Sequence, residues 1–313
     1  MDISGIPQNM KVYGGASCRK VGLTIDGVDY LMKLPGSLKA RNMKNVELSY
    51  SNSPICEYIG SHIYAMLGMP VHETLLAMRD SKLVVLCKDF VSKDCDLYEF
   101  SKIKISYEPA FINQNGEETD GMGSSLSEAL LVLAQHPLFL RIPEASIYFW
   151  KMFIIDAIIG NPDRNNGNWG VLVNRDTKEV ELAPVYDNGN CLNDKWDENK
   201  MLKFLNNDQL FINEAYKGKV CYFTDDSGKK INPYQLIASH KYVGCTEALN
   251  DILKVLDKEA ILRFIDEQDI LSDIQKQYYS KILDTRIEYL KQIKKETEVG
   301  IKQANIFRWV GMV

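Results

Sequence analysis

The stretch of sequence that decides the fold runs from Trp150 to Leu192 and reads WKMFIIDAIIGNPDRNNGNWGVLVNRDTKEVELAPVYDNGNCL. The apolar run at 149–159 predicts a buried helix. A polar run, 160–168, follows, and then come two short apolar segments, Trp169–Val173 and Val180–Pro184, with the composition of strands. The stretch therefore predicts a helix, a polar loop and a β-hairpin, with a second polar turn after the hairpin.

Three side chains in this stretch have a spacing typical of phosphoryl transfer. Asp163 and Asn168 form the pattern D-x-x-x-x-N, and Asp187 follows one hairpin later in Tyr186-Asp187-Asn188-Gly189. Transfer from ATP requires a carboxylate that orients a hydroxyl and accepts its proton, and a further carboxylate and an amide oxygen that hold Mg²⁺. Oxygen atoms of Asp and Asn suit this hard cation. A kinase catalytic loop followed by an Asp-Phe-Gly turn has the same layout.

The stretch also departs from the pattern of eukaryotic protein kinases. Asn161-Pro162 stands where His-Arg would precede the Asp, and Asn188 stands where Phe would follow the second Asp. Asn, Asp and Gly are in addition common in turns that bind nothing. The loop alone is equally compatible with a helix, turn and hairpin that bind no ligand. The flanking strands and the N-terminal half favour the kinase interpretation.

The N-terminal half predicts a small antiparallel sheet with a loop suited to phosphate. Tyr13 is followed by Gly14, Gly15, Ala16 and Ser17, whose small side chains would let backbone N–H groups approach an anion. The Asp-Gly pair at 26–27 is a hairpin signal between apolar segments at 21–25 and 30–34. Two glycines alone are a weak signal, and an ordinary hairpin stays open.

A lysine and a glutamate in this half match the remaining needs of phosphate binding. Lys33 lies near the end of the strand YLMKLP, and Glu57 lies in a helix predicted from Pro54 to Leu67. In kinases a strand Lys holds the α- and β-phosphates and pairs with a helix Glu. The alternative interpretation is that Lys33 and Glu57 face solvent on their strand and helix and do not pair. A hinge that reads adenine through its backbone is placed by position alone at Cys87–Phe90, which includes Lys88, Asp89 and Phe90.

Composition excludes several classes of protein. The chain has 313 residues, 45% of them hydrophobic, and a net charge of −5. We expect no direct nucleic-acid binding, because no basic domain or stripe is present, and no membrane insertion, because no apolar run is long enough. The 7 cysteines and 4 histidines show no metal-ligand spacing and no disulfide framework. We expect a cytoplasmic location, and a non-classical export route to a host cell stays open.

Two lobes are predicted, with an N-lobe at 1–92 and a C-lobe at 93–313. The first part of the C-lobe, 95–123, looks polar and irregular, and a helix is expected from Ser125 to Ala134. After Leu192 the apolar spacing predicts successive amphipathic helices, among them 271–283 and 284–296. The fold class is therefore α+β: a small antiparallel-sheet N-lobe with one main helix and a larger, mostly helical C-lobe.

With these motifs the chain resembles a known family, the HipA-like bacterial serine/threonine kinases, and within that family the shorter, secreted type. The combination of N-x-D-R-x-x-x-N with a following Y-D-x-G is the specific part of the resemblance. The matching segments cover roughly 12–192 and comprise Tyr13–Ala16, Tyr30–Pro35, Ser53–Leu67, Val84–Phe90, Asn161–Gly170 and Ala183–Gly189.

The resemblance implies a bilobal protein-kinase-like fold and serine/threonine phosphorylation with ATP and Mg²⁺. It implies that Asp163 is the catalytic base and that Asn168 and Asp187 are metal ligands. Lys33 would hold phosphates, and 14–17 would form the phosphate loop, with Ser17 as the candidate autophosphorylation site. Longer family members act beside a DNA-binding antitoxin and carry an extra N-terminal subdomain. This chain starts almost at the glycine loop, which argues against an antitoxin partner.

The leading hypothesis is thus a protein kinase that acts on an unidentified protein substrate and on itself. A kinase for a small-molecule hydroxyl keeps the same fold, since fold does not define the acceptor. A catalytically weak nucleotide-binding interaction module is the third hypothesis, supported by the departures from His-Arg-Asp and Asp-Phe-Gly. The retained Asp163, Asn168 and Asp187 argue against it.

Overall fold

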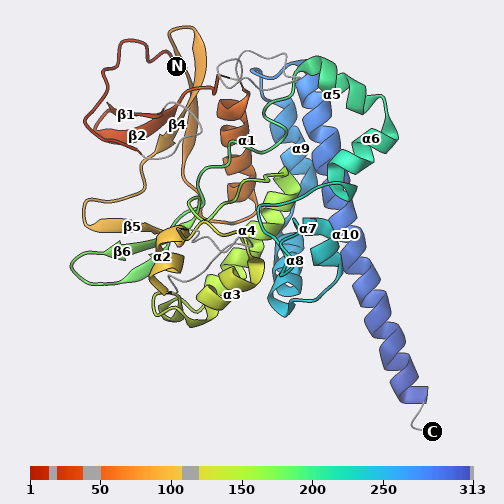
Figure 1. The fold of residues 1–313 in the computed structure, drawn as a ribbon. Helices are drawn as coiled ribbons and strands as arrows, with labels where there is room; N and C mark the ends of the chain where they lie inside the picture. The colour runs from red at the N-terminus through yellow and green to blue at the C-terminus, as the bar shows by residue number, and fades with distance from the viewer. Residues whose placement is uncertain (14–19, 38–50, 108–119, 311–313) are drawn as a thin grey trace.

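The computed structural model describes residues 1–13, 20–37, 51–107 and 120–310, and side chains as far as Glu296. Two antiparallel sheets and a large helical part make up the molecule (Figure 1). The first sheet has the strand order β1-β2-β4-β3, with β1 at Lys20–Ile25, β2 at Val28–Lys33, β3 at Thr74–Arg79 and β4 at Lys82–Lys88. The predicted hairpin is present, with Asp26 and Gly27 both at positive φ, as a two-residue turn requires.

The two faces of this sheet have different partners. Met32, Val84 and Leu86 pack with Ile3 in a small apolar cluster on one face. Side chains alternate between faces along a strand, so Lys33, Val85 and Cys87 lie on the other. That face contacts helix α1, Ser53–Met66. A charged side chain at the end of β2 is thereby directed toward the helix and away from the apolar cluster.

A second sheet follows and corrects the prediction of irregular structure across 95–123. Strand β5, Cys95–Glu99, pairs with β6, Gly170–Asn174, which pairs in turn with β7, Val180–Leu182. Helix α2, Phe100–Tyr107, continues directly from β5. Sequence periodicity missed these elements because β5 is stabilised by a partner about 75 residues away in the chain, and polar residues occupy much of it.

Helix α4, Ala145–Ile159, forms the centre of the helical part. From Tyr148 to Ile159 its side chains are buried all round except for the half-buried Lys151, as its mostly apolar composition predicts. The helix ends at Gly160, whose φ of 69° is the left-handed conformation usual after a helix C-terminus. The polar loop therefore leaves α4 in a defined direction.

The remaining helices surround α4 and α1 (Figure 1). They are α3 (Leu126–Gln135), η1 (Phe139–Arg141), α5 (Glu198–Leu205), α6 (Asp208–Ile212), η2 (Asn213–Lys217), α7 (Pro233–Ala238), α8 (Val243–Val255), α9 (Lys258–Asp266) and α10 (Asp273–Val310).

Helix α10 corrects another prediction, because the two helices expected at 271–283 and 284–296 are one. Its buried face runs without a break from Tyr278 through Ile282 and Ile287 to Ile293. The last turns of α10 extend away from the body of the molecule (Figure 1). Among the described residues, no helix combines the length and apolar character needed to cross a membrane. The α+β architecture is confirmed, and the division between residues 92 and 93 stays a prediction.

Candidate active site

A cavity of about 710 Å³ lies between the first sheet and the helical part. Its volume is typical of a small-molecule or cofactor site. Seven residues predicted for catalysis or cofactor binding line it: Lys33, Lys88, Asp89, Phe90, Asp163, Asn168 and Asp187. Gly14, Gly15, Ala16 and Ser17 lie outside the described residues.

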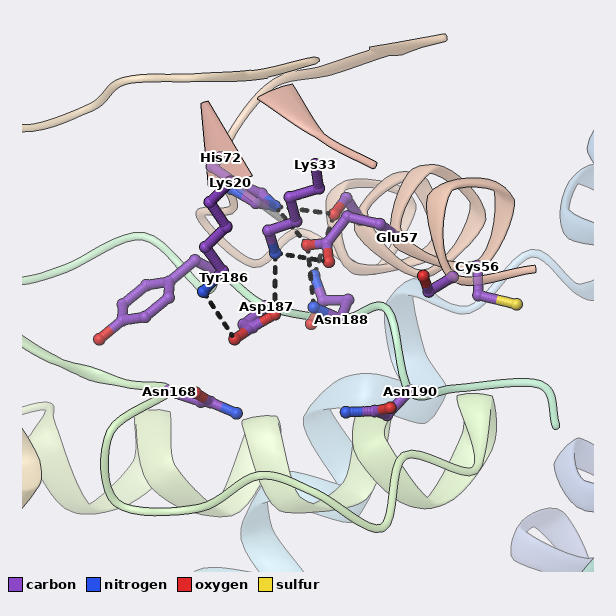
Figure 2. Close-up of polar contacts among 12 residues, drawn as sticks. Lys20, Lys33, Cys56, Glu57, His72, Asn168, Tyr186, Asp187, Asn188 and Asn190 are labelled. Atoms are coloured by element: carbon purple, nitrogen blue, oxygen red, sulfur yellow. Dashed lines mark hydrogen bonds and ion pairs between the residues drawn. The ribbon is translucent and has the colours of Figure 1, made fainter. Parts of the chain in front are cut away.

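Lys33 connects the two halves of the site. Its Nζ lies 2.7 Å from Glu57 Oε2 on α1 and 2.8 Å from Asp187 Oδ1 on the turn after β7 (Figure 2). The Lys33 and Glu57 side chains are only 7% and 1% exposed, and that of Asp187 is 22% exposed. The predicted Lys33–Glu57 ion pair is therefore present, and it extends to the predicted metal ligand.

The charges of this cluster stabilise one another. Burial alone would raise the pKa of Glu57, but Lys33 and a hydrogen bond from His72 outweigh burial and lower it. Burial likewise opposes ionisation of Asp187, while Lys33 and Lys20 lower its pKa below the ordinary value. The pKa of Lys33 is raised, because the two carboxylates outweigh the effect of burial. All three groups are charged at neutral pH.

Glu57 has two further partners that the sequence did not reveal. His72 Nε2 lies 3.0 Å from Glu57 Oε1, and the backbone N–H of Asn188 donates to the same oxygen at 2.9 Å. The Asn188 amide also donates to Ser61 of α1 at 3.0 Å. Helix α1 and the turn that carries Asp187 are thus attached directly to each other.

The Asp163 carboxylate is held by two amides. Asn165 Nδ2 donates to its Oδ1 at 3.1 Å, and Asn190 Nδ2 donates to its Oδ2 at 2.8 Å. The side chain is half-buried and lines the cavity. Asn165 lies two residues from Asp163, so the sequence alone could have suggested it as a hydrogen-bond partner. Asn190 lies beyond the hairpin, and no spacing rule identifies it as a partner.

Asn168 is oriented by the same loop. Its Nδ2 donates to the backbone oxygen of Asp163 at 2.8 Å, which leaves the amide oxygen as the ligand atom. Asp187 has a φ of 61°, an uncommon conformation for a residue other than glycine. Asn168 and Asp187 line the same cavity and offer only hard oxygen ligands, so this donor set suits Mg²⁺.

Arg164, which sequence analysis did not assign, holds these segments together. It is 3% exposed, and its guanidinium binds both oxygens of Asp156 on α4, at 2.9 and 3.0 Å. It also donates to the backbone oxygens of Asn168 and Tyr186 and to the side chain of Asn188. The available sequence signal for this buried pair was Asp156, a carboxylate within the apolar run at 152–159.

Aromatic side chains also line the cavity. Asp89 Oδ2 accepts hydrogen bonds from Tyr13 and from Lys11, each at 2.9 Å. The rings of Phe90 and Tyr186 lie 5.6 Å apart. Flat apolar surfaces of this kind suit a nucleobase. The Lys88 ammonium, in contrast, is paired with Glu73 at 2.7 Å on the exposed side of the sheet.

Comparison with known proteins identifies the class that this fold and site define, a serine/threonine-protein kinase. No family model matches the chain. The chain is 32% identical over 277 residues to the serine/threonine-protein kinase CtkA of Helicobacter pylori, a match that covers 88% of this chain and 81% of CtkA. The chain therefore belongs to the family of serine/threonine kinases related to CtkA and is a phosphotransferase.

Solved structures agree with this assignment. The crystal structure of the proinflammatory kinase CtkA of Helicobacter pylori matches with a TM-score of 0.83 and 29% identity, over 94% of this chain and 96% of that one. HipA of Shewanella oneidensis, in its complex with HipB and operator DNA, matches with a TM-score of 0.50 and 11% identity, over 91% of this chain and 67% of that one. The second match supports the fold alone.

Proposed function

We propose that the protein transfers the γ-phosphoryl group of ATP, with Mg²⁺, to serine or threonine hydroxyls of a protein substrate and of itself. The observation that carries this proposal is the bridge of Lys33 between Glu57 and Asp187 in one cavity with Asp163 and Asn168. A strand Lys, a helix Glu, a loop Asp and two oxygen ligands are the groups that kinase chemistry requires.

Asp163 is proposed as the group that orients the acceptor hydroxyl and takes its proton. Hydrogen bonds from Asn165 and Asn190 hold one carboxylate oxygen each, so the side chain is positioned before substrate arrives. Each oxygen keeps a further lone pair for the hydroxyl hydrogen. Correct orientation of such a group contributes as much as its basicity.

Asn168 and Asp187 are proposed to hold the metal ion, which when bound neutralises charge on the phosphates. Lys33 now lies against Asp187 Oδ1 and is proposed to contact the α- and β-phosphates when nucleotide is bound. Glu57 would then keep the Lys33 ammonium in place from the other side. The aromatic rings of Phe90 and Tyr186, which line the cavity, would accept the adenine ring.

The proposed activity is tested by incubating the purified protein with radiolabelled ATP and Mg²⁺, alongside Asp187→Ala. We expect label on the wild-type protein and loss of at least 100-fold in the variant, since one stabilising group for the transition state is removed. Asp269→Ala, which changes an exposed carboxylate, is the matched control and should label like the wild type.

Peptide mapping of the labelled protein tests the autophosphorylation proposal. We propose Ser17 as the site, and label at the same peptide in Ser17→Ala would remove that assignment. An unlabelled wild-type protein that still binds nucleotide would contradict protein phosphorylation and favour a small-molecule acceptor. Equal labelling of wild type and Asp187→Ala would contradict the metal-ligand role.

A further inference from the structure

Three buried side chains with different donor atoms converge beside Lys33. Glu57, His72 and Cys87 are 1%, 5% and 2% exposed, and their carboxylate oxygen, imidazole nitrogen and thiol sulfur lie within 4.8 Å of one another. Phosphoryl transfer uses Glu57 and needs neither a thiol nor an imidazole at this place. The sequence spacing of cysteines and histidines did not predict the cluster, because its members come from separate elements.

Each of the three residues is held by its backbone, two of them within a helix or a strand. Glu57 belongs to α1, and His72 is fixed by its backbone N–H, which donates to Val185 at 3.0 Å. Cys87 lies in β4, in register with Leu31 on one side and Thr74 on the other. His72 and Cys87 also line the large cavity, so the cluster borders it directly.

Thr74 supplies an independent observation. It lies directly opposite Cys87 in an antiparallel pair, and such residues point to the same face of a sheet. Thr74 is 5% exposed, and its hydroxyl has no hydrogen-bond partner among the described residues. A buried polar group normally has a partner in the protein or in an ordered water, and a group without one calls for an explanation such as a bound water or ion. The hydroxyl therefore points to a group that completes this site.

The donor set determines which ion would bind. Zn²⁺ and similar borderline-soft ions accept thiolate, imidazole and carboxylate in tetrahedral geometry, whereas Mg²⁺ prefers oxygen alone. We propose that Glu57, His72 and Cys87 form a binding site for a zinc-like transition-metal ion, with a water that contacts Thr74 as the fourth ligand.

Binding at this site has a defined chemistry and consequence. The Cys87 thiol loses its proton to solvent when it coordinates the ion, so one proton is released for each ion bound. Asp187 offsets part of the repulsion between the ion and the Lys33 ammonium. The ion would bind to Glu57 Oε1, the oxygen that now accepts a hydrogen bond from the backbone N–H of Asn188. The site does not depend on the proposed phosphoryl transfer.

Cobalt is the spectroscopic probe that tests the site. The full chain is titrated with Co²⁺ under reducing conditions and without nucleotide, and the thiolate-to-cobalt charge-transfer band and the tetrahedral visible bands are recorded. We expect both bands to saturate at one ion per chain and to disappear on addition of Zn²⁺. Absence of a charge-transfer band in the wild-type protein would overturn the proposal.

Variants identify the ligands. Cys87→Ser should remove the charge-transfer band, and His72→Asn should weaken cobalt affinity at least tenfold. Cys95→Ser, which changes a half-buried cysteine on β5, is the matched control and should leave the titration unchanged. A band that persists in Cys87→Ser, or that disappears in Cys95→Ser, would refute the assignment.

X-ray absorption of the zinc-loaded wild-type protein gives an answer that does not depend on the folding of any variant. The proposal requires one sulfur ligand at about 2.3 Å and nitrogen or oxygen ligands at about 2.0–2.2 Å. Two or more sulfur ligands, or none, would contradict it.

Discussion

Lys33 is the residue on which the charges of the site depend, because it is buried between two carboxylates from distant parts of the chain. A buried ion pair adds little net stability compared with apolar packing, but removal of one partner leaves a charge without compensation. The cluster is therefore sensitive both to mutation and to acid.

Glu57→Gln should lower the free energy of unfolding near neutral pH by about 3–5 kcal/mol, because it leaves the buried Lys33 with one partner. The folded pKa of Glu57 lies below the ordinary value of 4.5, so its contribution is present above that pH and is lost as the pH falls toward the folded pKa. Chemical denaturation of wild type and variant from about pH 7 to pH 3 measures this difference. A difference that grows on acidification would contradict the assigned sign.

Asn190→Ala should lower kcat about 10–100-fold and leave the KM for ATP within about twofold, because the residue positions Asp163 and does not line the nucleotide cavity. Steady-state kinetics separates the two constants. Asn190→Asp is the informative companion, since it replaces a donor by a carboxylate that repels Asp163. A rise in KM as large as the fall in kcat would indicate that Asn190 has a general structural role.

At the scale of elements, the direction in which α4 ends determines where the catalytic loop lies. Gly160 has a φ of 69°, and a Cβ at this position would lie 2.4 Å from Nη1 of Arg286. Arg286 is fully buried and donates to the backbone oxygens of Ala215 and Ile158, so it has no room to move aside. This glycine is required by both backbone conformation and packing.

Gly160→Ala should therefore destabilise the protein more than Gly68→Ala. Gly68, after α1, has a similar φ of 75° but open space around the position of a Cβ. We expect about 1–2 kcal/mol for Gly68→Ala from backbone strain alone. Gly160→Ala adds overpacking against Arg286, which costs about 1–3 kcal/mol more. Urea denaturation measures the free energy of unfolding of both variants. Equal losses of stability would show that Arg286 moves aside without an energetic penalty.

At the scale of the whole molecule, the cavity is lined by residues from the first sheet and from the helical part, so a ligand there connects them. A ligand that binds only the folded state raises stability by an amount set by its concentration relative to Kd. Nucleotide binding should therefore be visible as stabilisation of the entire chain.

ATP with Mg²⁺ at about 100 times its Kd should raise the free energy of unfolding by about 2.7 kcal/mol. Thermal denaturation with ATP and Mg²⁺, with ATP alone and with Mg²⁺ alone separates the contributions, and the full shift should need both. The Asp187→Ala protein should lose the part of the shift that depends on Mg²⁺. An unchanged Tm in wild type at all nucleotide concentrations would exclude nucleotide binding at this cavity.

Local features of the chain were predictable from its sequence. The apolar run before Gly160 predicted α4, the Asp-Gly pair predicted the first hairpin, and the spacing of Asp163 and Asn168 predicted residues that the fold brings to one cavity. Strand β5 and the continuity of α10 were not predicted. Pairing with a distant strand can stabilise a polar segment that has no local preference for the strand conformation.

The sequence by itself determined the helix, loop and hairpin around Asp163 and the residue types needed for phosphoryl transfer, because backbone conformation and side-chain periodicity are local properties. Only the tertiary structure decided that Asn190 holds Asp163, that Arg164 joins three segments, and that His72 and Cys87 meet Glu57. These contacts join residues far apart in the chain. Their partners are selected by the packing of whole elements, which no spacing rule along the sequence contains.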